Sequence, residues 1–406
     1  MDDGQSVVTQ RQRRGAVSLL LAMVLLGVFP LDVLLPSFPA LAEHFRSTPA
    51  DIALSISLFA VGIAFAQLLI GPLSDVIGRK GLLLAGMSVS MLGALGCVMT
   101  SDYSLFLLFR VVQALGCGCF VLSQALVQDL FEGEERDRLR ILMVTATGIF
   151  ISVSPLAGTF LQATLGWRGS FWVFTALSAI VLLKAWWLLD SSRPAASGGT
   201  PTHFLKAYRR VLGDFDFVRY WLISAFAFAC HFSFIVISPL IFMDRLQLSA
   251  YDFSLILLIY GAAYVVGGIL ASVLSRRING GQQIVVGLSL ILFAGLTMLY
   301  LASNFALTPA TVLIPMLICT AGTTIARPAA TSRAMSLFPE NAGTSASAGS
   351  TLIFICGGLI SALISLSPAN LHATLGYSFV ILSGVALALN ARISRRNDLV
   401  GQPDSD

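Results

Sequence analysis

Residues 71–80 read GPLSDVIGRK, a polar, turn-like stretch between two long apolar runs. The stretch places one acid, Asp75, and two bases, Arg79 and Lys80, within ten residues. Crossing the hydrocarbon core of a bilayer takes roughly 20 apolar residues, so an apolar chain carries such a stretch where it leaves the membrane. The stretch is therefore predicted to be a short loop between two membrane-spanning helices.

The composition of the whole chain agrees with that interpretation. Of its 406 residues, 56% are hydrophobic and 11% are charged, and the mean hydropathy is +0.84. Soluble domains are about 45–50% apolar and about 25% charged. The runs long enough to span a membrane number twelve, near residues 16–37, 52–71, 81–100, 104–126, 139–164, 169–189, 219–241, 252–274, 283–302, 308–328, 343–365 and 374–391. We expect an all-α membrane protein with twelve transmembrane helices, the first retained because it lacks a small-residue cleavage site.

The basic residues lie mostly on one side of the predicted membrane. With both termini placed inside, Arg46, Arg168 and Arg245 lie outside, and Arg110 falls within a span. The other 21 of the 25 Lys and Arg lie in or beside the inner segments. The positive-inside rule therefore predicts a multi-pass protein of the bacterial inner membrane with both termini in the cytoplasm. The net charge of +4 reflects this sorting, so no nucleic-acid partner is expected.

Several classes of protein find no support in the sequence. All six Cys fall within predicted spans, without the context of disulfides or the spacing of metal ligands. No Gly-rich phosphate loop, HExxH motif or Ser/His/Asp grouping stands out. We therefore expect no enzyme activity, no cofactor and no metal site.

A polar segment between the sixth and seventh runs divides the chain. Its Pro, Gly and Ser residues are typical of a flexible connector, and it ends in a short basic helix. The predicted domains are an N-terminal six-helix bundle at 1–190, a cytoplasmic linker at 191–218 and a C-terminal six-helix bundle at 219–406. GILASVLSRR at 268–277 aligns without gaps with residues 71–80, so the two halves are interpreted as degenerate repeats.

These features resemble the major facilitator superfamily of transporters. GPLSDVIGRK matches that family's signature loop between helices two and three, although Val76 stands where a further Arg is common. FRVVQALGCG at 109–118 is similar to the helix-four motif of proton-linked drug antiporters. SVSPLAGTF at 152–160 is similar to the helix-five exporter motif, with departures at Ser154 and Thr159. WRGSFWVF and FPENAGTSASA resemble the bicyclomycin and chloramphenicol resistance subfamily. The resemblance implies two bundles around one central cavity and transport by alternating access.

The resemblance also implies a role for the loop between helices two and three. In the family this loop latches the outward-facing conformation. The residues onto which that role carries over are Gly71, Asp75, Gly78, Arg79 and Lys80. The carboxylate can accept hydrogen bonds from a neighbouring helix N-terminus, while the bases face anionic lipid headgroups. A solvated loop that only obeys the positive-inside rule is the alternative, and it explains neither the acid nor the glycines.

Ionisable side chains inside predicted spans are candidates for function, because each costs about 2.5 to 3.5 kcal/mol to insert. Asp32 is the one carboxylate well inside a span, about 7 Å below the outer boundary, and Arg110 lies about 9 Å below it. Each is the other's expected partner, and Gln113 lies on the same helix face as Arg110. Because burial and a nearby cation act oppositely on a carboxyl, movement of Arg110 or binding of cargo can switch the protonation of Asp32. These three residues are the predicted site of proton and cargo coupling; a structural ion pair is the alternative.

Four further residues are candidates. His231, near the middle of the seventh run, could bind cargo or relay protons, or could be hydrogen-bonded into helix packing. Arg327, near the cytoplasmic end of the tenth run, is a candidate anion contact if it faces the cavity; otherwise it extends to the lipid headgroups. In the helix-five motif, Pro155 and Gly158 are predicted to supply a bend or a tight contact for rocking.

The predicted function is proton-coupled export of small amphipathic compounds, that is, multidrug efflux by an antiporter. Its partners are the cargo, protons and membrane lipid, and it is expected to be a monomer. One alternative keeps the fold and changes the cargo to an endogenous metabolite such as an anionic siderophore, which Arg327 and His231 would suit. A receptor or scaffold that transports nothing is the second alternative, and it has no use for a lone carboxylate at Asp32.

Overall fold

The structure is a computed structural model that describes residues 10–131, 133–189, 201–338, 342–367 and 370–400. The elements of the N-terminal half are α1 (Gln10–Asp32), η1 (Leu35–Ser37), α2 (Phe38–Phe45), α3 (Pro49–Ile77), α4 (Arg79–Met99), α5 (Tyr103–Cys117), η2 (Gly118–Val121), α6 (Leu122–Leu130), α7 (Gly133–Leu165) and α8 (Arg168–Leu188). The elements that follow are α9 (Pro201–Gly213), α10 (Phe215–Pro239), η3 (Leu240–Arg245), α11 (Ala250–Ser275), α12 (Gly280–Asn304), α13 (Pro309–Ser336), α14 (Ala342–Ser365) and α15 (Leu371–Val400).

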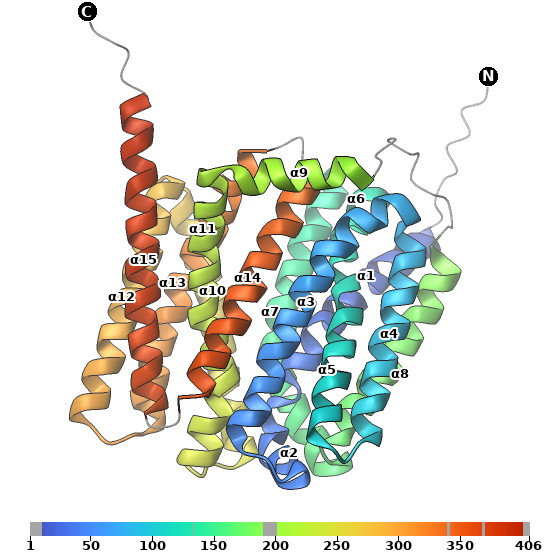
Figure 1. The fold of residues 1–406 in the computed structure, drawn as a ribbon, viewed down its shortest axis with the longest axis horizontal. Coiled ribbons are helices and arrows are strands. Elements are labelled where there is room, and N and C mark those ends of the chain that lie inside the picture. Colours follow the sequence, from blue (N-terminus) through green and yellow to red (C-terminus); the bar gives the residue numbers. More distant parts are fainter. Residues whose placement is uncertain (1–9, 132, 190–200, 339–341, 368–369, 401–406) are drawn as a thin grey trace, which may run out of the picture.

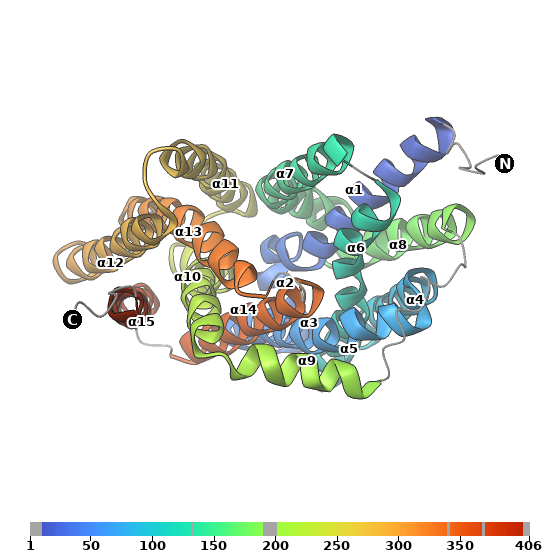
Figure 2. The same cartoon turned by 90° about the horizontal axis from the view of Figure 1, so that it is seen from above.

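The described residues contain twelve candidate membrane spans, long and apolar enough to cross a bilayer, which confirms the all-α membrane fold. Seen from above, α1 and α3–α8 lie on one side, and α10–α15, the C-terminal half, lie on the other (Figure 2). The halves meet where α3 packs on α14 and α7 packs on α11. The helix α9 lies across one end of the bundle, which we call the linker face, and α2 lies at the opposite end (Figure 1).

The sequence itself sets several helix starts. Thr48 and Asp51 form a reciprocal capping box at the start of α3. Asp102, Asp214 and Ser249 accept hydrogen bonds from backbone N–H groups at the starts of α5, α10 and α11. Such caps satisfy donors that have no partner within the helix. Three of the aspartates are therefore occupied at the ends of helices, outside the interior of the spans.

The first span is interrupted, contrary to the continuous helix expected from its hydropathy. The α1 helix ends at Asp32, and the candidate span continues through η1 and α2 to Phe45. The helix stops because the carbonyl of Asp32 would need the backbone N–H of residue 36, and Pro36 has none. Asp32 therefore lies at a break inside the span, deeper than its predicted place near the outer end.

The stretch at 71–80 is more helical than its turn-like composition predicts. The helix α3 runs through Ile77 and α4 begins at Arg79, so Gly78 alone separates them. Gly78 has a φ of 97°, a conformation that residues with a Cβ rarely adopt. The prediction of a ten-residue loop was wrong because the stretch satisfies its polar groups within the helix: Ser74 Oγ donates to the carbonyl of Gly71 at 2.7 Å.

Two seams of hydrogen bonds join the halves. In the α3–α14 seam, Ser57 Oγ lies 2.8 Å from Ser361 Oγ, and Ser347 Oγ donates to the carbonyl of Gln67 at 2.8 Å. Nearest the linker face, the hydroxyl of Tyr208 in α9 lies 3.0 Å from Ser347 Oγ. These bonds are spread along α3 from its first turns to its last third. The α3–α14 seam therefore holds the halves together over much of the membrane depth.

The α7–α11 seam is shorter. Thr159 Oγ1 lies 2.5 Å from Ser254 Oγ, which donates to the carbonyl of Pro155 at 3.1 Å. Farther along, Gly261 packs so closely on Ser152 that a Cβ at Gly261 would lie 2.7 Å from the Cα of Ser152. The hydrogen bonds of this seam all lie in the part of α7 and α11 that is remote from the linker face.

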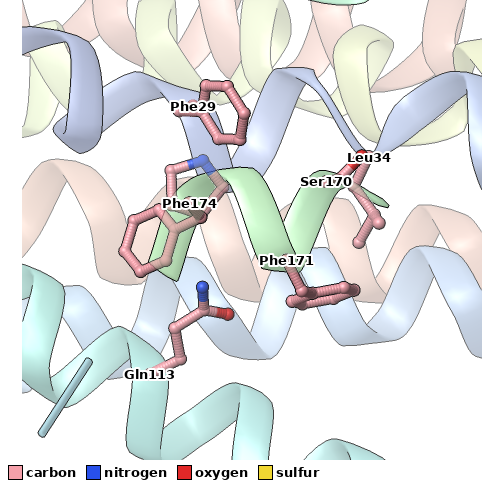
Figure 3. Close-up of a pocket in the computed structure, with 7 residues that line it drawn as sticks. Phe29, Leu34, Gln113, Ser170, Phe171 and Phe174 are labelled. Carbon is pink, nitrogen blue, oxygen red and sulfur yellow. The ribbon is translucent and has the colours of Figure 1, made fainter. Parts of the chain in front are cut away.

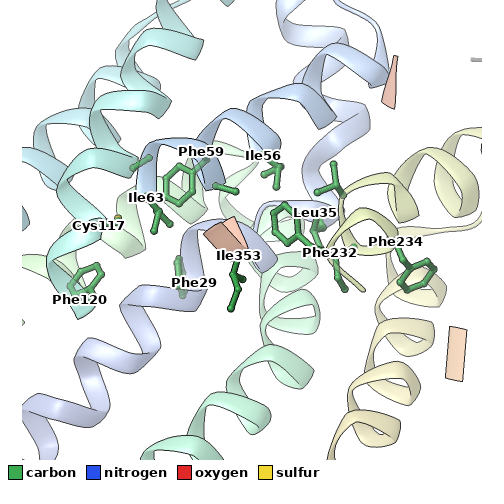
Figure 4. Packing of buried hydrophobic residues seen from close by; sticks show 14 of the residues in the cluster. Phe29, Leu35, Ile56, Phe59, Ile63, Cys117, Phe120, Phe232, Phe234 and Ile353 are labelled. Carbon is green, nitrogen blue, oxygen red and sulfur yellow. The ribbon is translucent and has the colours of Figure 1, made fainter. Parts of the chain in front are cut away.

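Apolar side chains fill the region where the halves meet. Phe29 of α1, Phe59 of α3, Phe120 of η2, Phe232 of α10 and Ile353 of α14 belong to one buried cluster (Figure 4). In such dry surroundings a hydrogen bond is stronger and an unpaired polar group is more costly than in water. The partners of each buried polar side chain therefore decide what that side chain can do.

Candidate functional site

Asp32 lies at the break between α1 and η1, where the chain leaves its helical path. The residue is buried, with 8% of its surface exposed. Its carboxyl makes no hydrogen bond or ion pair with any residue that the structure describes, whereas most buried polar groups have a partner. A charged carboxylate in this last helical turn also meets the negative end of the helix dipole. The site thus holds an acid without the contacts that would fix it in its charged form.

Arg110 of α5 caps the same helix end. Its Nη2 donates to the carbonyl of Pro30 at 3.2 Å, and its Nη1 donates to Gln113 Oε1 at 2.8 Å. The guanidinium carbon lies 4.1 Å from the centre of the Phe59 ring, in a cation–π contact. Arg110 is fully buried. The arginine therefore fixes the last turn of α1, two residues before Asp32.

The ion pair expected between Asp32 and Arg110 does not form in this conformation. The reason is the broken helix: the carbonyl of Pro30 belongs to the last turn of α1 and has lost its helical donor. A cation at the C-terminal end of a helix is favourable there. Sequence reasoning placed Arg110 and Gln113 beside α1 but could not foresee that the arginine would bind a backbone carbonyl.

A small cavity adjoins this cluster. Its lining residues come from α1, the break after it, α5 and α8, and are Phe29, Pro30, Leu34, Gln113, Ser170, Phe171 and Phe174 (Figure 3). The cavity volume is about 10 Å³, which is room for about one water molecule. Ser170 Oγ is buried beside it without a hydrogen-bond partner among the described residues. This cavity is too small for a cargo molecule.

His231 of α10 is buried and bonded across to α11. The hydroxyl of Tyr260 forms a hydrogen bond with His231 Nδ1, and the two rings are stacked with centroids 5.4 Å apart. Tyr264, one turn farther along α11, also touches the imidazole, with centroids 5.5 Å apart. The η1 helix, three residues after Asp32, packs on both α10 and α11. Asp32 and His231 therefore lie where the two halves meet.

The guanidinium of Arg327 in α13 lies against α10. Its guanidinium carbon lies 4.8 Å from the centre of the Phe228 ring of α10, and its Nε is buried without a hydrogen-bond partner among the described residues. Its charge acts on His231. Nine residues separate Arg327 from the end of α13, which is roughly 13 Å along a helix. We call Asp32, Tyr260, His231 and Arg327 the central site.

The predicted latch residues lie at the linker face. Arg79 donates to Asp129 Oδ2 of α6 at 3.2 Å and also bonds Ser74 Oγ. Lys80 lies over the Trp186 ring of α8 at 5.6 Å. Both bases thus contact protein within their own half, in addition to the predicted contact with headgroups. The side chain of Asp75 lies outside the described part of the structure.

Gly71 and the helix-five motif contact other helices closely. A Cβ on Gly71 would lie 3.2 Å from Ser347 Oγ of α14. A Cβ on Gly158 would lie 2.2 Å from the carbonyl oxygen of Val33, so only glycine lets α7 approach the break next to Asp32. Pro155 contributes its carbonyl to Ser254 of α11 at 3.1 Å.

Sequence reasoning missed three residues that the structure brings into play. Thr159 was noted only as a departure from the helix-five motif, yet its hydroxyl bonds Ser254 and lies 3.1 Å from the carbonyl of Ala250. Neither Ser254 nor Tyr260 carried a signal of its own. An aromatic or hydroxyl residue is common in any span, and its role depends on which helix it faces.

Buried ionisable groups at the meeting of two helical bundles are typical of a secondary membrane transporter. Residues 19–362 match the family model of the Major Facilitator Superfamily, and the chain belongs to that family. The chain is accordingly a transporter and not an enzyme.

Curated relatives cover nearly the whole chain. Multidrug resistance protein MdtL of Salmonella heidelberg (strain SL476) is 25% identical over 392 residues, which are 95% of this chain and 98% of that protein. A chloramphenicol resistance protein of Pseudomonas aeruginosa is 29% identical over 402 residues, which are 96% of this chain and 93% of that protein. Both relatives agree with the resemblance to drug-resistance transporters.

Solved structures share the fold at low sequence identity. A bacterial homologue of the human lysosomal transporter Spinster, solved in an inward-facing and unoccupied conformation, has a TM-score of 0.75 and 16% identity, covering 98% of this chain and 100% of that one. A D-xylose–proton symporter has a TM-score of 0.75 and 15% identity, covering 93% of this chain and 97% of that one. These two likenesses establish the fold alone.

Proposed function

We propose that this transporter exports small amphipathic compounds from a bacterial cell in exchange for protons, as a monomer in the inner membrane. The names of the curated relatives support drug-like cargo. The distribution of Lys and Arg supports a cytoplasmic linker face, with both termini on that side.

The observation that carries the proposal is the isolation of Asp32. It is the only acidic residue among the buried residues that the structure describes. An ionisable group inside a span is retained for function, since its insertion is costly. Because no described side chain neutralises Asp32, a proton is left to do so.

The broken span suggests how binding is coupled to movement. Asp32 ends α1, which Arg110 holds, and the η1 helix that follows packs on α10 and α11 of the other half. A proton on Asp32 removes a charge at the boundary between the halves, and loss of the proton restores it. The two charge states therefore favour different packing of η1 against α10 and α11, and this difference drives alternation.

The energy available is sufficient for useful export. One unit charge moved across the membrane yields about 2.3 kcal/mol per 100 mV. A tenfold concentration ratio takes about 1.4 kcal/mol. One proton moved inward with a neutral cargo moved outward can thus sustain a cargo gradient of roughly 40-fold from 100 mV.

The test uses proteoliposomes, with chloramphenicol as the cargo because a relative is named for resistance to it. Asp32→Asn is expected to abolish uphill transport driven by a pH gradient while leaving downhill exchange of chloramphenicol intact. Asp244→Asn, at an exposed aspartate of η3, is the matched control and should transport as the parent does. Uphill transport that survives in Asp32→Asn would refute the proposed coupling.

A further inference from the structure

One cation in the central site has no described partner of opposite charge. Arg327 makes no hydrogen bond or ion pair within the described residues, and its guanidinium carbon lies over the Phe228 ring, 4.8 Å from the ring centre. Arginine stays protonated in proteins and carries five N–H donors. A guanidinium inside a span that leaves these donors unused is a costly arrangement unless something else binds them.

The acidic residues of the C-terminal half are occupied elsewhere. Asp214 caps the start of α10, and Asp252 Oδ2 accepts a hydrogen bond at 2.7 Å from Ser249 Oγ, the cap of α11. Asp216 pairs with Arg219 at 3.5 Å, and Asp244 is exposed at the end of η3. Among the acids whose side chains the structure describes in this half, none neutralises Arg327.

A second arginine on α13, Arg333, does have a hydrogen-bond partner within the protein. Arg333, six residues later, donates from Nη1 to the hydroxyl of Tyr220 at 3.1 Å. Its guanidinium also lies beside Gly280 at the start of α12, where a Cβ would be 3.1 Å from its Nε. Arg333 is thus bonded within the protein, whereas Arg327 keeps its hydrogen-bonding capacity.

The surroundings of Arg327 are aromatic. Phe228 is half-buried and stacks on Phe232 with centroids 5.3 Å apart and ring planes at 17°. Phe354 of α14 meets the Phe228 ring edge-on at 5.5 Å. Gly357 lets Phe228 pack on α14, since a Cβ there would lie 2.7 Å from the ring. The result is a fixed aromatic surface beside an unneutralised cation.

We propose that Arg327, Phe228 and His231 form a subsite for an anionic group, so that amphipathic cargoes with a carboxylate on an aromatic or apolar body are preferred over neutral ones. This inference rests on the proposed export function and specifies its preferred cargo. The edge of a guanidinium binds a carboxylate through two parallel hydrogen bonds, and the unpaired Nε–H belongs to such an edge. The apolar body of the cargo packs against the aromatic cluster of Phe228, Phe232 and Phe354.

An anionic cargo changes the response to membrane potential. A proton carried inward and an anion carried outward together move two positive charge equivalents inward. Each charge multiplies the attainable cargo gradient roughly 40-fold per 100 mV. Export of an anion is therefore driven more strongly by potential than export of a neutral compound of the same size.

The experiment compares binding of 2-naphthoate and its uncharged analogue 2-naphthamide to the full-length protein in detergent, by quenching of tryptophan fluorescence. We expect the parent protein to bind the acid roughly 10- to 100-fold more tightly than the amide. Arg327→Gln should abolish that preference, and Arg327→Lys should retain part of it. Arg333→Gln is the matched control and should keep the full preference.

Each outcome bears on the subsite. A parent protein without preference for the acid, whether both compounds bind or neither does, would overturn the inference, as would an unchanged preference in Arg327→Gln. The two readouts separate this inference from the proposed coupling: uphill transport of chloramphenicol tests the coupling, whereas the preference for naphthoate is measured in detergent without any gradient. Failure of the coupling thus leaves the binding result interpretable.

Discussion

The two arginines that face the interior of the helical bundle differ in burial and in the number of their hydrogen bonds. Arg110 in the N-terminal half is fully buried, bonds Gln113 and the Pro30 carbonyl, and lies 4.1 Å from the Phe59 ring. Arg327 in the C-terminal half is partly exposed and has a ring contact but no described hydrogen bond. The same side chain therefore builds structure in one half and remains available to a ligand in the other.

Energetic considerations support this distinction. Arg110 is fully buried and Arg327 is partly exposed, so Arg110 bears the larger cost of desolvation and depends more on its contacts. Hydrogen bonds from a charged donor contribute about 1.5 to 3 kcal/mol each. A buried cation–π contact adds about 2 kcal/mol, and a more exposed one about 0.5 to 1 kcal/mol. The contacts of Arg110 should therefore contribute about 3 kcal/mol more than those of Arg327.

The largest predicted effect tests this difference directly. Arg110→Met should destabilise the protein by about 3 kcal/mol relative to Arg327→Met, because it leaves the Pro30 carbonyl and Gln113 Oε1 without their donor. Arg327→Met should be close to neutral. The measurement is the thermal unfolding of each variant in detergent, with the exposed Arg277→Met as the control. Equal unfolding temperatures for Arg110→Met and Arg327→Met would contradict the proposed difference between the two arginines.

The next prediction concerns the other support of the end of α1. Gly158→Ala would put a Cβ 2.2 Å from the Val33 carbonyl oxygen, so α7 must move away from the break beside Asp32. Overpacking of this kind costs about 1 to 3 kcal/mol. We expect a destabilisation of about 2 kcal/mol and a loss of uphill transport.

The control for that substitution is Gly384→Ala. A Cβ at Gly384 in α15 meets nothing within 4 Å, and alanine favours a helix over glycine by about 1 kcal/mol. Gly384→Ala should therefore be neutral or slightly stabilising. If Gly158→Ala behaves in the same way in unfolding and transport assays, close packing at the break is not required.

A third prediction separates the charge of Arg110 from its shape. Arg110→Lys keeps a positive charge but offers a compact ammonium in place of a planar fork. The ammonium cannot span from Gln113 Oε1 to the Pro30 carbonyl as two guanidinium nitrogens do. We expect a destabilisation of about 1.5 kcal/mol, near one charged hydrogen bond. Thermal unfolding that matches the parent would show that charge alone suffices.

The sequence predicts the fold well because each span carries its own signal. Hydropathy located the twelve candidate spans, since a helix in lipid needs an apolar run of sufficient length. The break after Asp32 was also within reach of the sequence, because Pro36 lacks the N–H that the Asp32 carbonyl requires. The loop at 71–80 was predicted too long, because polar residues that bond within their own helix resemble a turn.

The central site was less accessible to sequence reasoning. Asp32, Arg110 and His231 stood out because charged or titratable residues are rare in spans. Their partners did not, since a backbone carbonyl such as that of Pro30 has no signature in a sequence. The bond between Tyr260 and His231 joins residues of different helices, and hydropathy gives no information on which faces of two helices meet.

The smallest predicted effect concerns that bond. Tyr260→Phe removes the hydroxyl and leaves His231 Nδ1 without its partner, at a cost of about 1 kcal/mol. Tyr264→Phe is the matched control, because Tyr264 touches His231 through its ring and has no described hydrogen bond. Combining Tyr260→Phe with His231→Leu in a double-mutant cycle should give a coupling energy of about 1 kcal/mol, and Tyr264→Phe with His231→Leu a smaller one. Equal couplings would mean that ring packing, and not the hydroxyl, holds His231 beside Arg327.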